Sequence, residues 1–219
     1  MKLLSVNVGR PRLAQFEGGT ISTAIFKVPV EGRVMVRRLN IDGDRQANLD
    51  VHGGEHKAVY AYPYEHYAYW AEAIGRDDFS LGQFGENVTV EGMHETDVNI
   101  GDRFCVGSAI VQVTQPRIPC RNLAVRMRMP EFPKLFLRSG RCGFYLRVEQ
   151  EGEVGAGDTI ERISTDPEGV SIHALFAMRF LGEPDRELIE RALRINVLPP
   201  YWRGELEEMK ATLDRDSPT

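Results

Sequence analysis

The strongest constraint on the fold is a change of hydrophobic pattern close to residue 165. Before it, short runs rich in β-branched residues alternate with turn signals, for example at residues 3–8, 20–28 and 103–114. Runs of this kind predict β-strands. The segment 164–169 has the composition of a linker, and beyond it apolar residues recur at the spacing of amphipathic helices.

The helical tail contains three separate patterns, and the last of them places Trp202, Leu206 and Leu213 on one helix face. Three short helices are marginally stable alone, so we expect this unit to dock on the rest of the chain. We therefore predict a mainly β (α+β) protein, with a β domain over residues 1–164 and a three-helix domain over residues 165–219.

The charge and the cysteine count narrow the class of protein. The chain carries 27 Lys and Arg against 32 Asp and Glu, a net charge of −5, which argues against general binding of nucleic acid or of an anionic membrane. Its three cysteines form no C-x-x-C pair, and the sequence begins without the apolar stretch of a signal peptide. We expect a reduced, soluble, cytoplasmic protein.

The segment around Cys120 is the most informative one for function. Pro116 and Pro119 stiffen the backbone, and Arg117 and Arg121 flank the thiol. Nearby positive charge favours the thiolate, which is both the nucleophilic and the metal-binding form of cysteine. The segment therefore suits an anionic metal cofactor or an anionic thiol-reactive substrate. The alternative is that Cys120 is a small buried residue at the end of a strand.

A second segment combines paired glycines with a lysine. Gly53 and Gly54 allow close approach of the backbone to a ligand, and Lys57 adds positive charge, which together suggest a phosphate or pterin cradle. The alternative is a plain tight turn with a solvated lysine. His52 and His56 have the spacing of two zinc ligands on a helix, but the glycines between them disfavour a helix.

Several other polar residues are weaker candidates. Asp44 and Asp50 could act as acid or base groups, although carboxylates on surface loops are usually solvated. The amide of Asn87 could satisfy backbone or ligand groups. Cys105 alternates with core positions of its strand, which predicts a packing role, and Cys142 lies in a glycine-rich loop that could face the same pocket as Cys120.

Taken in order, these motifs resemble the MOSC family, the domain also found at the C-terminus of molybdenum-cofactor sulfurases, and most closely its YiiM-like members. The resemblance covers almost the whole chain. It rests on His52-Gly53-Gly54, Lys57-Ala58-Val59, Tyr62-Pro63, His66-Tyr67 with Trp70, Phe84-Gly85-Glu86-Asn87, Ile100-Gly101-Asp102, Gln115-Pro116-Arg117, Pro119-Cys120, and Gly143 with Tyr145 and Arg147-Val148.

This resemblance implies a β-barrel with peripheral helices and a C-terminal three-helix bundle, which binds the pterin form of the molybdenum cofactor. Cys120 is expected to ligate molybdenum through its thiolate, in agreement with the preference of soft metals for sulfur. The anionic cofactor would be held by the remaining residues of the implied site, which are Gly53, Gly54, Lys57, Asn87, Arg117, Arg121 and Arg147.

The resemblance also implies an activity: reduction of N-hydroxylated compounds, such as 6-N-hydroxylaminopurine, to amines. Electrons would come from a separate flavin-containing reductase, and His52 or Asp50 would supply a proton as water leaves. Two other functions remain open on the sequence. Cys120 could carry a persulfide in a sulfur-transfer protein, or the chain could be a non-catalytic module that binds and hands over the molybdenum cofactor.

Overall fold

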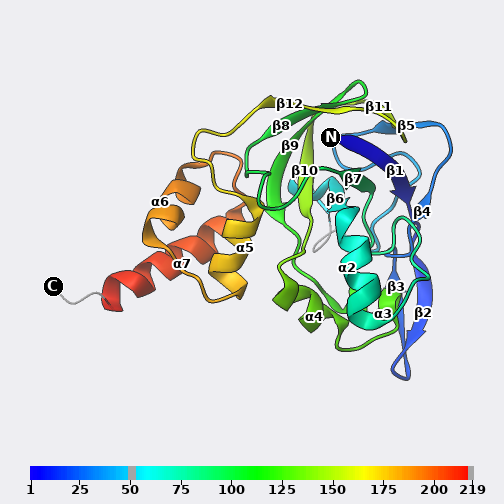
Figure 1. Cartoon of the computed structure of the whole chain (residues 1–219), viewed down its shortest axis with the longest axis horizontal. Helices are drawn as coiled ribbons and strands as arrows, with labels where there is room; N and C mark the ends of the chain where they lie inside the picture. Colours follow the sequence, from blue (N-terminus) through cyan, green and yellow to red (C-terminus); the bar gives the residue numbers. More distant parts are fainter. Residues whose placement is uncertain (49–52, 217–219) are drawn as a thin grey trace.

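The fold is described here from a computed structural model that covers residues 1–48 and 53–216 (Figure 1). Its centre is an eight-stranded sheet in which all neighbours are antiparallel except β6 and β7. From edge to edge, the strands are β12 (Ile160–Ser164), β8 (Arg103–Val106), β9 (Ala109–Pro116), β10 (Phe144–Gln150), β6 (Val59–Pro63), β7 (Val88–Glu91), β1 (Lys2–Val8) and β4 (Val28–Pro29).

The sheet is mixed and does not form a closed barrel within the described residues, so the barrel expected from the resemblance is not confirmed. The two ends of the sheet do approach each other, through an isolated bridge between Lys2 and Thr159. Two further strand pairs lie beside it: β2 (Arg12–Phe16) with β3 (Gly19–Thr23), and β5 (Arg33–Val36) with β11 (Gly152–Gly155).

Helices cover the sheet in two groups. The first consists of η1 (Glu55–Lys57), α2 (Glu65–Ile74), α3 (Arg121–Met127) and α4 (Phe132–Ser139). The second consists of α5 (Ile172–Phe180), α6 (Arg186–Arg194) and α7 (Pro200–Asp216), which gather at one end of the molecule beside β8, β9 and β10 (Figure 1). Across the described residues, no helix combines the length and the apolar character that crossing a membrane requires.

The three predicted tail helices are present, but the way they pack is only partly that of a bundle. Helices α6 and α7 pack on each other, whereas α5 packs on β9 of the sheet. Phe180 of α5 meets the indole of Trp202 of α7 edge to face, with ring centroids 6.1 Å apart. The predicted division into two domains at residue 164 coincides with the end of β12, and it stays a prediction.

An aromatic cluster fills the space between the sheet and helices α2 and α4. The rings of Trp70 and Phe136 stack with centroids 5.6 Å apart, and Trp70 Nε1 donates a hydrogen bond of 2.7 Å to the Tyr62 hydroxyl. Aromatic pairs of this kind add to the free energy gained from area burial alone. The cluster gives a rigid backing to the loop between β9 and α3, because the Arg117 guanidinium lies over the Phe136 ring at 5.1 Å.

A glycine is required at position 143, where the loop between β9 and α3 meets the start of β10. Gly143 has φ +63°, and a Cβ there would lie 2.5 Å from the carbonyl oxygen of Ala61. The Gly143 N–H donates to the Glu95 carboxylate (2.7 Å), and its carbonyl oxygen accepts from the N–H of Arg117 (3.2 Å). This close approach fixes the backbone just before Cys120.

The tail is joined to the sheet by a buried hydrogen bond. Trp202 is fully buried, and its Nε1 donates to Gln115 Oε1 at 3.1 Å. The amide nitrogen of Gln115 in turn donates to the carbonyl oxygen of His56 at 3.2 Å. A side chain of α7 is therefore connected through β9 to the turn η1 that carries Lys57.

Replacing Trp202 with phenylalanine should lower the free energy of unfolding by about 1–2 kcal/mol, because Gln115 Oε1 loses its donor while most of the apolar contact is kept. Urea denaturation of the wild type and the variant measures this difference. Tyr201→Phe is a suitable control, since Tyr201 is half exposed. Equal unfolding midpoints for wild type and Trp202→Phe would show that this bond does not help to hold the tail.

Candidate functional site

One pocket brings together residues from distant parts of the sequence around Cys120. It has a cavity volume of about 110 Å³ between the described atoms. Most of its walls come from three segments: the stretch after β3, the loop 44–48, and the loop that leads into α3. The lining residues used below are Lys27, Asp44, Arg45, Lys57, Tyr60, Asn87, Arg117, Cys120 and Tyr145.

Cys120 lies where the loop after β9 becomes helix α3. It is the N-cap residue, with extended backbone angles (φ −136°, ψ 177°), and its carbonyl oxygen accepts the N–H of Leu123 at 2.9 Å. Its side chain is half buried and lines the pocket. The thiol is therefore accessible from the pocket while its backbone is fixed by the helix start.

Arg117 supplies a buried positive charge to the same pocket. Its side chain is only 5% exposed, and the guanidinium lies over the rings of Tyr60 (5.3 Å) and Phe136 (5.1 Å). Across the described residues, no carboxylate lies within ion-pair distance of it, and its buried Nη1 atom has no hydrogen-bond acceptor. Because a guanidinium stays protonated in proteins, this arrangement calls for an anion.

Lys57 reaches the pocket through the glycine turn. Gly54 has φ +89° and ψ 169°, a conformation that favours glycine, and its carbonyl oxygen accepts the N–H of Lys57 at 3.1 Å. Burial lowers the pKa of Lys57, and the nearby sulfur of Cys120 acts in the opposite direction. Gly54 therefore serves to place Lys57, while its own backbone does not line the pocket.

A buried ion pair forms another wall of the pocket. The Lys27 ammonium contacts Asp44 Oδ1 at 2.5 Å, with side chains only 8% and 1% exposed. The same carboxylate accepts the N–H of Gly9 (2.7 Å) and the side-chain amide of Asn87 (2.9 Å). Burial lowers the pKa of Lys27, and the interactions with Asp44 partly offset this effect.

The charges lining the pocket are unbalanced. Lys27, Arg45, Lys57 and Arg117 are cationic, and among the described lining residues only Asp44 is a carboxylate. Asp44 neutralises Lys27, and Arg117, which has no carboxylate at ion-pair distance among the described residues, brings positive charge to the same pocket as the Cys120 thiol. Chemically, the pocket can hold an anion against a soft sulfur ligand or nucleophile.

The structure does not bring two of the predicted cofactor-binding arginines into this pocket. Arg121 is exposed on α3 and faces Glu17 at 3.9 Å. Arg147 projects from β10 toward Gln112 (2.8 Å) and Glu149 (3.4 Å). His52 and Asp50, the predicted proton donors, lie outside the described residues.

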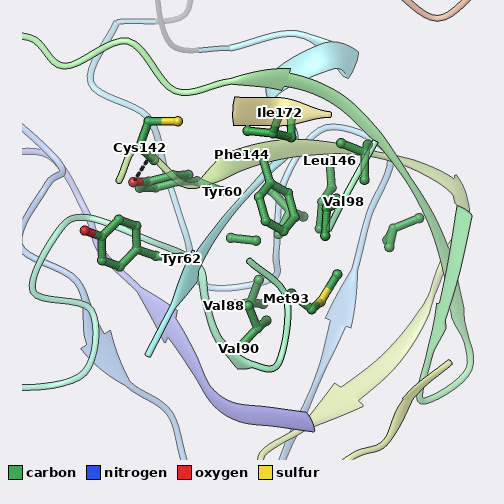
Figure 2. Packing of buried hydrophobic residues seen from close by; sticks show 14 of the residues in the cluster. Tyr60, Tyr62, Val88, Val90, Met93, Val98, Cys142, Phe144, Leu146 and Ile172 are labelled. Atoms are coloured by element: carbon green, nitrogen blue, oxygen red, sulfur yellow. Dashed lines mark hydrogen bonds between the residues drawn. The ribbon is translucent and has the colours of Figure 1, made fainter. Parts of the chain in front are cut away.

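The two other cysteines differ from their predictions. Cys142 does not face the pocket but is fully buried in the core, which raises the pKa of its thiol well above the ordinary value. Figure 2 shows it among the packed residues, where its carbonyl oxygen accepts the Tyr60 hydroxyl at 2.9 Å. Cys105 is not a core residue; it lies on the half-exposed face of β8, 3.6 Å from the carbonyl oxygen of Gly107.

Lys27 was not predicted as a pocket residue, and Asp44 was expected either to be solvated or to act as an acid or base group. A signal for Lys27 was present, because it interrupts the apolar stretch Ile25–Phe26 and Val28. A lysine in such a stretch requires a buried partner. The partner itself could not be identified from local sequence, since Asp44 lies 17 positions further along the chain.

Residues 48–161 of this chain match the family model of the MOSC domain. The uncharacterized protein YflK of Bacillus subtilis is 39% identical over 211 residues, which span 96% of this chain and 95% of YflK. A protein named "Reductase" from Gibberella moniliformis is 36% identical over 161 residues, 72% of this chain and 28% of its own length. The crystal structure of YiiM from Geobacillus stearothermophilus superposes with a TM-score of 0.80 at 33% identity, covering 95% of this chain and 98% of that one.

Proposed function

The chain belongs to the MOSC domain family, and from this premise we propose that it is an oxidoreductase which binds the molybdenum cofactor in the Cys120 pocket. Its proposed reaction is the reduction of N-hydroxylated compounds, such as 6-N-hydroxylaminopurine, to amines. The similarity to a protein named "Reductase" supports the reaction class. The similarity to YiiM supports the assignment to that branch of the family.

The observation that carries this proposal is the buried guanidinium of Arg117 without a carboxylate partner among the described residues. The molybdenum cofactor is anionic, because it is a pterin phosphate that holds its metal through sulfur. Lys57 adds a second positive charge, and Cys120 offers the soft ligand that such a metal accepts. The residues present therefore fit this cofactor.

In this proposal each residue has a defined task. Cys120 would ligate the metal, and Arg117 and Lys57 would hold the anionic part of the cofactor. Tyr60 and Tyr145 close the pocket wall and exclude water. When bound, the cofactor would supply the two-electron chemistry that cleaves the N–O bond.

Reduction of a hydroxylamine to an amine consumes two electrons and two protons and releases one water molecule. Lys27 lines the pocket, and burial lowers its pKa. Among the residues that the structure describes, it is therefore our candidate for the proton donor. His52 and Asp50 stay predictions for the same role. The electrons would come from a separate flavin-containing reductase.

The proposal is tested by expressing the chain with molybdate in a host that makes the cofactor. Elemental mass spectrometry should find nearly one molybdenum per chain, and reduction of 6-N-hydroxylaminopurine should follow when methyl viologen supplies electrons. Absence of molybdenum, when a control molybdoenzyme from the same host is loaded, would contradict the proposal.

Replacing Arg117 with methionine should reduce the molybdenum content at least about tenfold, because the anion loses its buried counter-charge. The same change should leave the free energy of unfolding equal or higher, since an unpaired buried charge is removed. Arg121→Met is the matched control, because it removes an exposed arginine four positions away. Full metal content in Arg117→Met would contradict the role assigned to this residue.

A persulfide carrier is the second candidate, because a half-exposed thiol beside two cations also suits sulfur transfer. Mass spectrometry of the purified chain distinguishes the two functions. A sulfur adduct on Cys120 in a protein without molybdenum would favour the carrier, and a metal-loaded protein with an unmodified thiol would favour the reductase.

A further inference from the structure

A groove beside the pocket is lined by residues of the β2–β3 hairpin, by Phe26 and by residues of helix α3 and its C-cap. Figure 1 shows this hairpin and α3 close together. It has a volume of about 500 Å³, and apolar side chains such as Phe16, Phe26 and Val125 line it. Leu13, at its edge, is 74% exposed, the highest value for any large hydrophobic residue in the described part of the chain. An exposed leucine next to an open apolar groove is a feature of interaction surfaces.

Arg12 and Arg128 line this groove, and Arg126 lies beside one of its lining residues, Phe26. The guanidinium of Arg12 stacks on the Phe26 ring at 3.7 Å, and that of Arg126 lies 5.5 Å from the same ring. Arg128 lies at the C-cap of α3, where its backbone adopts φ +54°. Within residues 1–48 and 53–215, none of the three has a carboxylate at ion-pair distance.

These positive charges lie close enough to affect one another. Burial lowers the pKa of Arg126, and the like charges of Arg12 and Arg76 lower it further. Arg76 is paired with Asp78, and Arg121 weakly faces Glu17 at the groove. In a chain with a net charge of −5, this concentration of unpaired arginines forms a local positive surface.

The groove is adjacent to the proposed redox site. Helix α3 starts directly after Cys120, and Arg128 follows eight positions later, a distance of about 12 Å along a helix. The strand β3 and the residues after it separate the two cavities, with Ala24 lining the pocket and Phe26 the groove. A partner seated in the groove would therefore lie one helix length from the thiol.

We propose that this groove, lined by Leu13 and Phe26 and bordered by Arg12, Arg126 and Arg128, docks the acidic flavin-bearing domain of the electron-supplying reductase. The proposal rests on the proposed function, which requires an external electron donor. Carboxylates of the partner would pair with the arginines, and Leu13 would supply an apolar anchor. Such charge complementarity speeds up transient encounters, which suits a donor that must bind and leave at each turnover.

The test uses reduced flavodoxin, a small acidic FMN protein, as the probe. Calorimetry at low salt should show binding to the wild type, and the double variant Arg12→Glu/Arg128→Glu should bind about tenfold more weakly with a smaller salt dependence. Lys210→Glu/Arg215→Glu makes the same change of charge on α7 and should bind like the wild type. The molybdenum content should be equal in all three proteins.

A kinetic measurement distinguishes failure of the docking proposal from failure of the proposed function. In Arg12→Glu/Arg128→Glu, reduction of 6-N-hydroxylaminopurine should fall with flavodoxin as donor and stay unchanged with methyl viologen. Absence of viologen-driven activity in all three proteins would refute the proposed function. The calorimetry would still show whether flavodoxin binds at the groove. Equal flavodoxin binding by all three proteins, no binding by the wild type, or binding only to phosphatidylserine vesicles would overturn the docking proposal.

Discussion

Replacing Cys120 with serine should give a folded protein that retains no molybdenum and reduces 6-N-hydroxylaminopurine only at background rate. Serine offers a hard oxygen in place of a soft thiolate, and it is not deprotonated at neutral pH. The fold should be preserved, because Cys120 is half exposed and serine is a favoured N-cap residue for α3. Elemental analysis, activity with methyl viologen and thermal unfolding together measure these three effects.

The matched control is Cys105→Ser, which changes a half-exposed thiol on β8 that does not line the pocket. It should keep both the metal and the activity. If Cys120→Ser also kept them, Cys120 would not be the ligand. If the wild type and both variants contained no metal, and Cys120 of the wild type carried a sulfur adduct, the persulfide function would replace the reductase function.

Replacing Asp44 with asparagine should lower the free energy of unfolding by about 3–5 kcal/mol, because it leaves the buried ammonium of Lys27 without a counter-charge. Asparagine has almost the same size as aspartate, so the lost free energy of unfolding comes from the change of charge and not from a change of packing. Chemical denaturation monitored by tryptophan fluorescence measures it. The pocket should also bind its anion less well, because Asn87 loses a partner that positions it.

A double-mutant cycle separates the pair from its surroundings. Lys27→Met removes the ammonium, and the Asp44 carboxylate then keeps its bonds from Gly9 and Asn87. The double variant Lys27→Met/Asp44→Asn should be more stable than Asp44→Asn alone, because it contains no buried ammonium without a counter-charge. If Lys27→Met changed the free energy of unfolding by the same amount with aspartate and with asparagine at position 44, the two charges would not interact in solution.

Much of the pocket could be predicted from the sequence because its central residues lie in short motifs. The two prolines and two arginines around Cys120, and the glycines before Lys57, identify those segments without knowledge of the fold. Asn87, predicted to bind the cofactor, lines this pocket, and its cofactor-binding role stays a prediction. What local motifs cannot give is the direction of each side chain, and this is why Arg121 and Arg147 were grouped with Arg117.

The features that were missed depend on long-range geometry. The pairing of Lys27 with Asp44 requires two loops to meet, and the burial of Cys142 depends on the close approach of Gly143 to Ala61. Barrel closure depends on the register between the first and last strands, where the structure shows an isolated bridge. Periodicity of single segments carries no information about such contacts.

The link from Trp202 through Gln115 to the backbone of His56 makes the side chain at position 115 serve two neighbours at once. Its oxygen accepts the indole N–H of α7, and its amide nitrogen donates to the turn η1 that precedes Lys57. A residue with only one of these two functions, such as glutamate, could keep only one of the two contacts. Position 115 therefore accepts fewer residue types than either neighbour would require by itself.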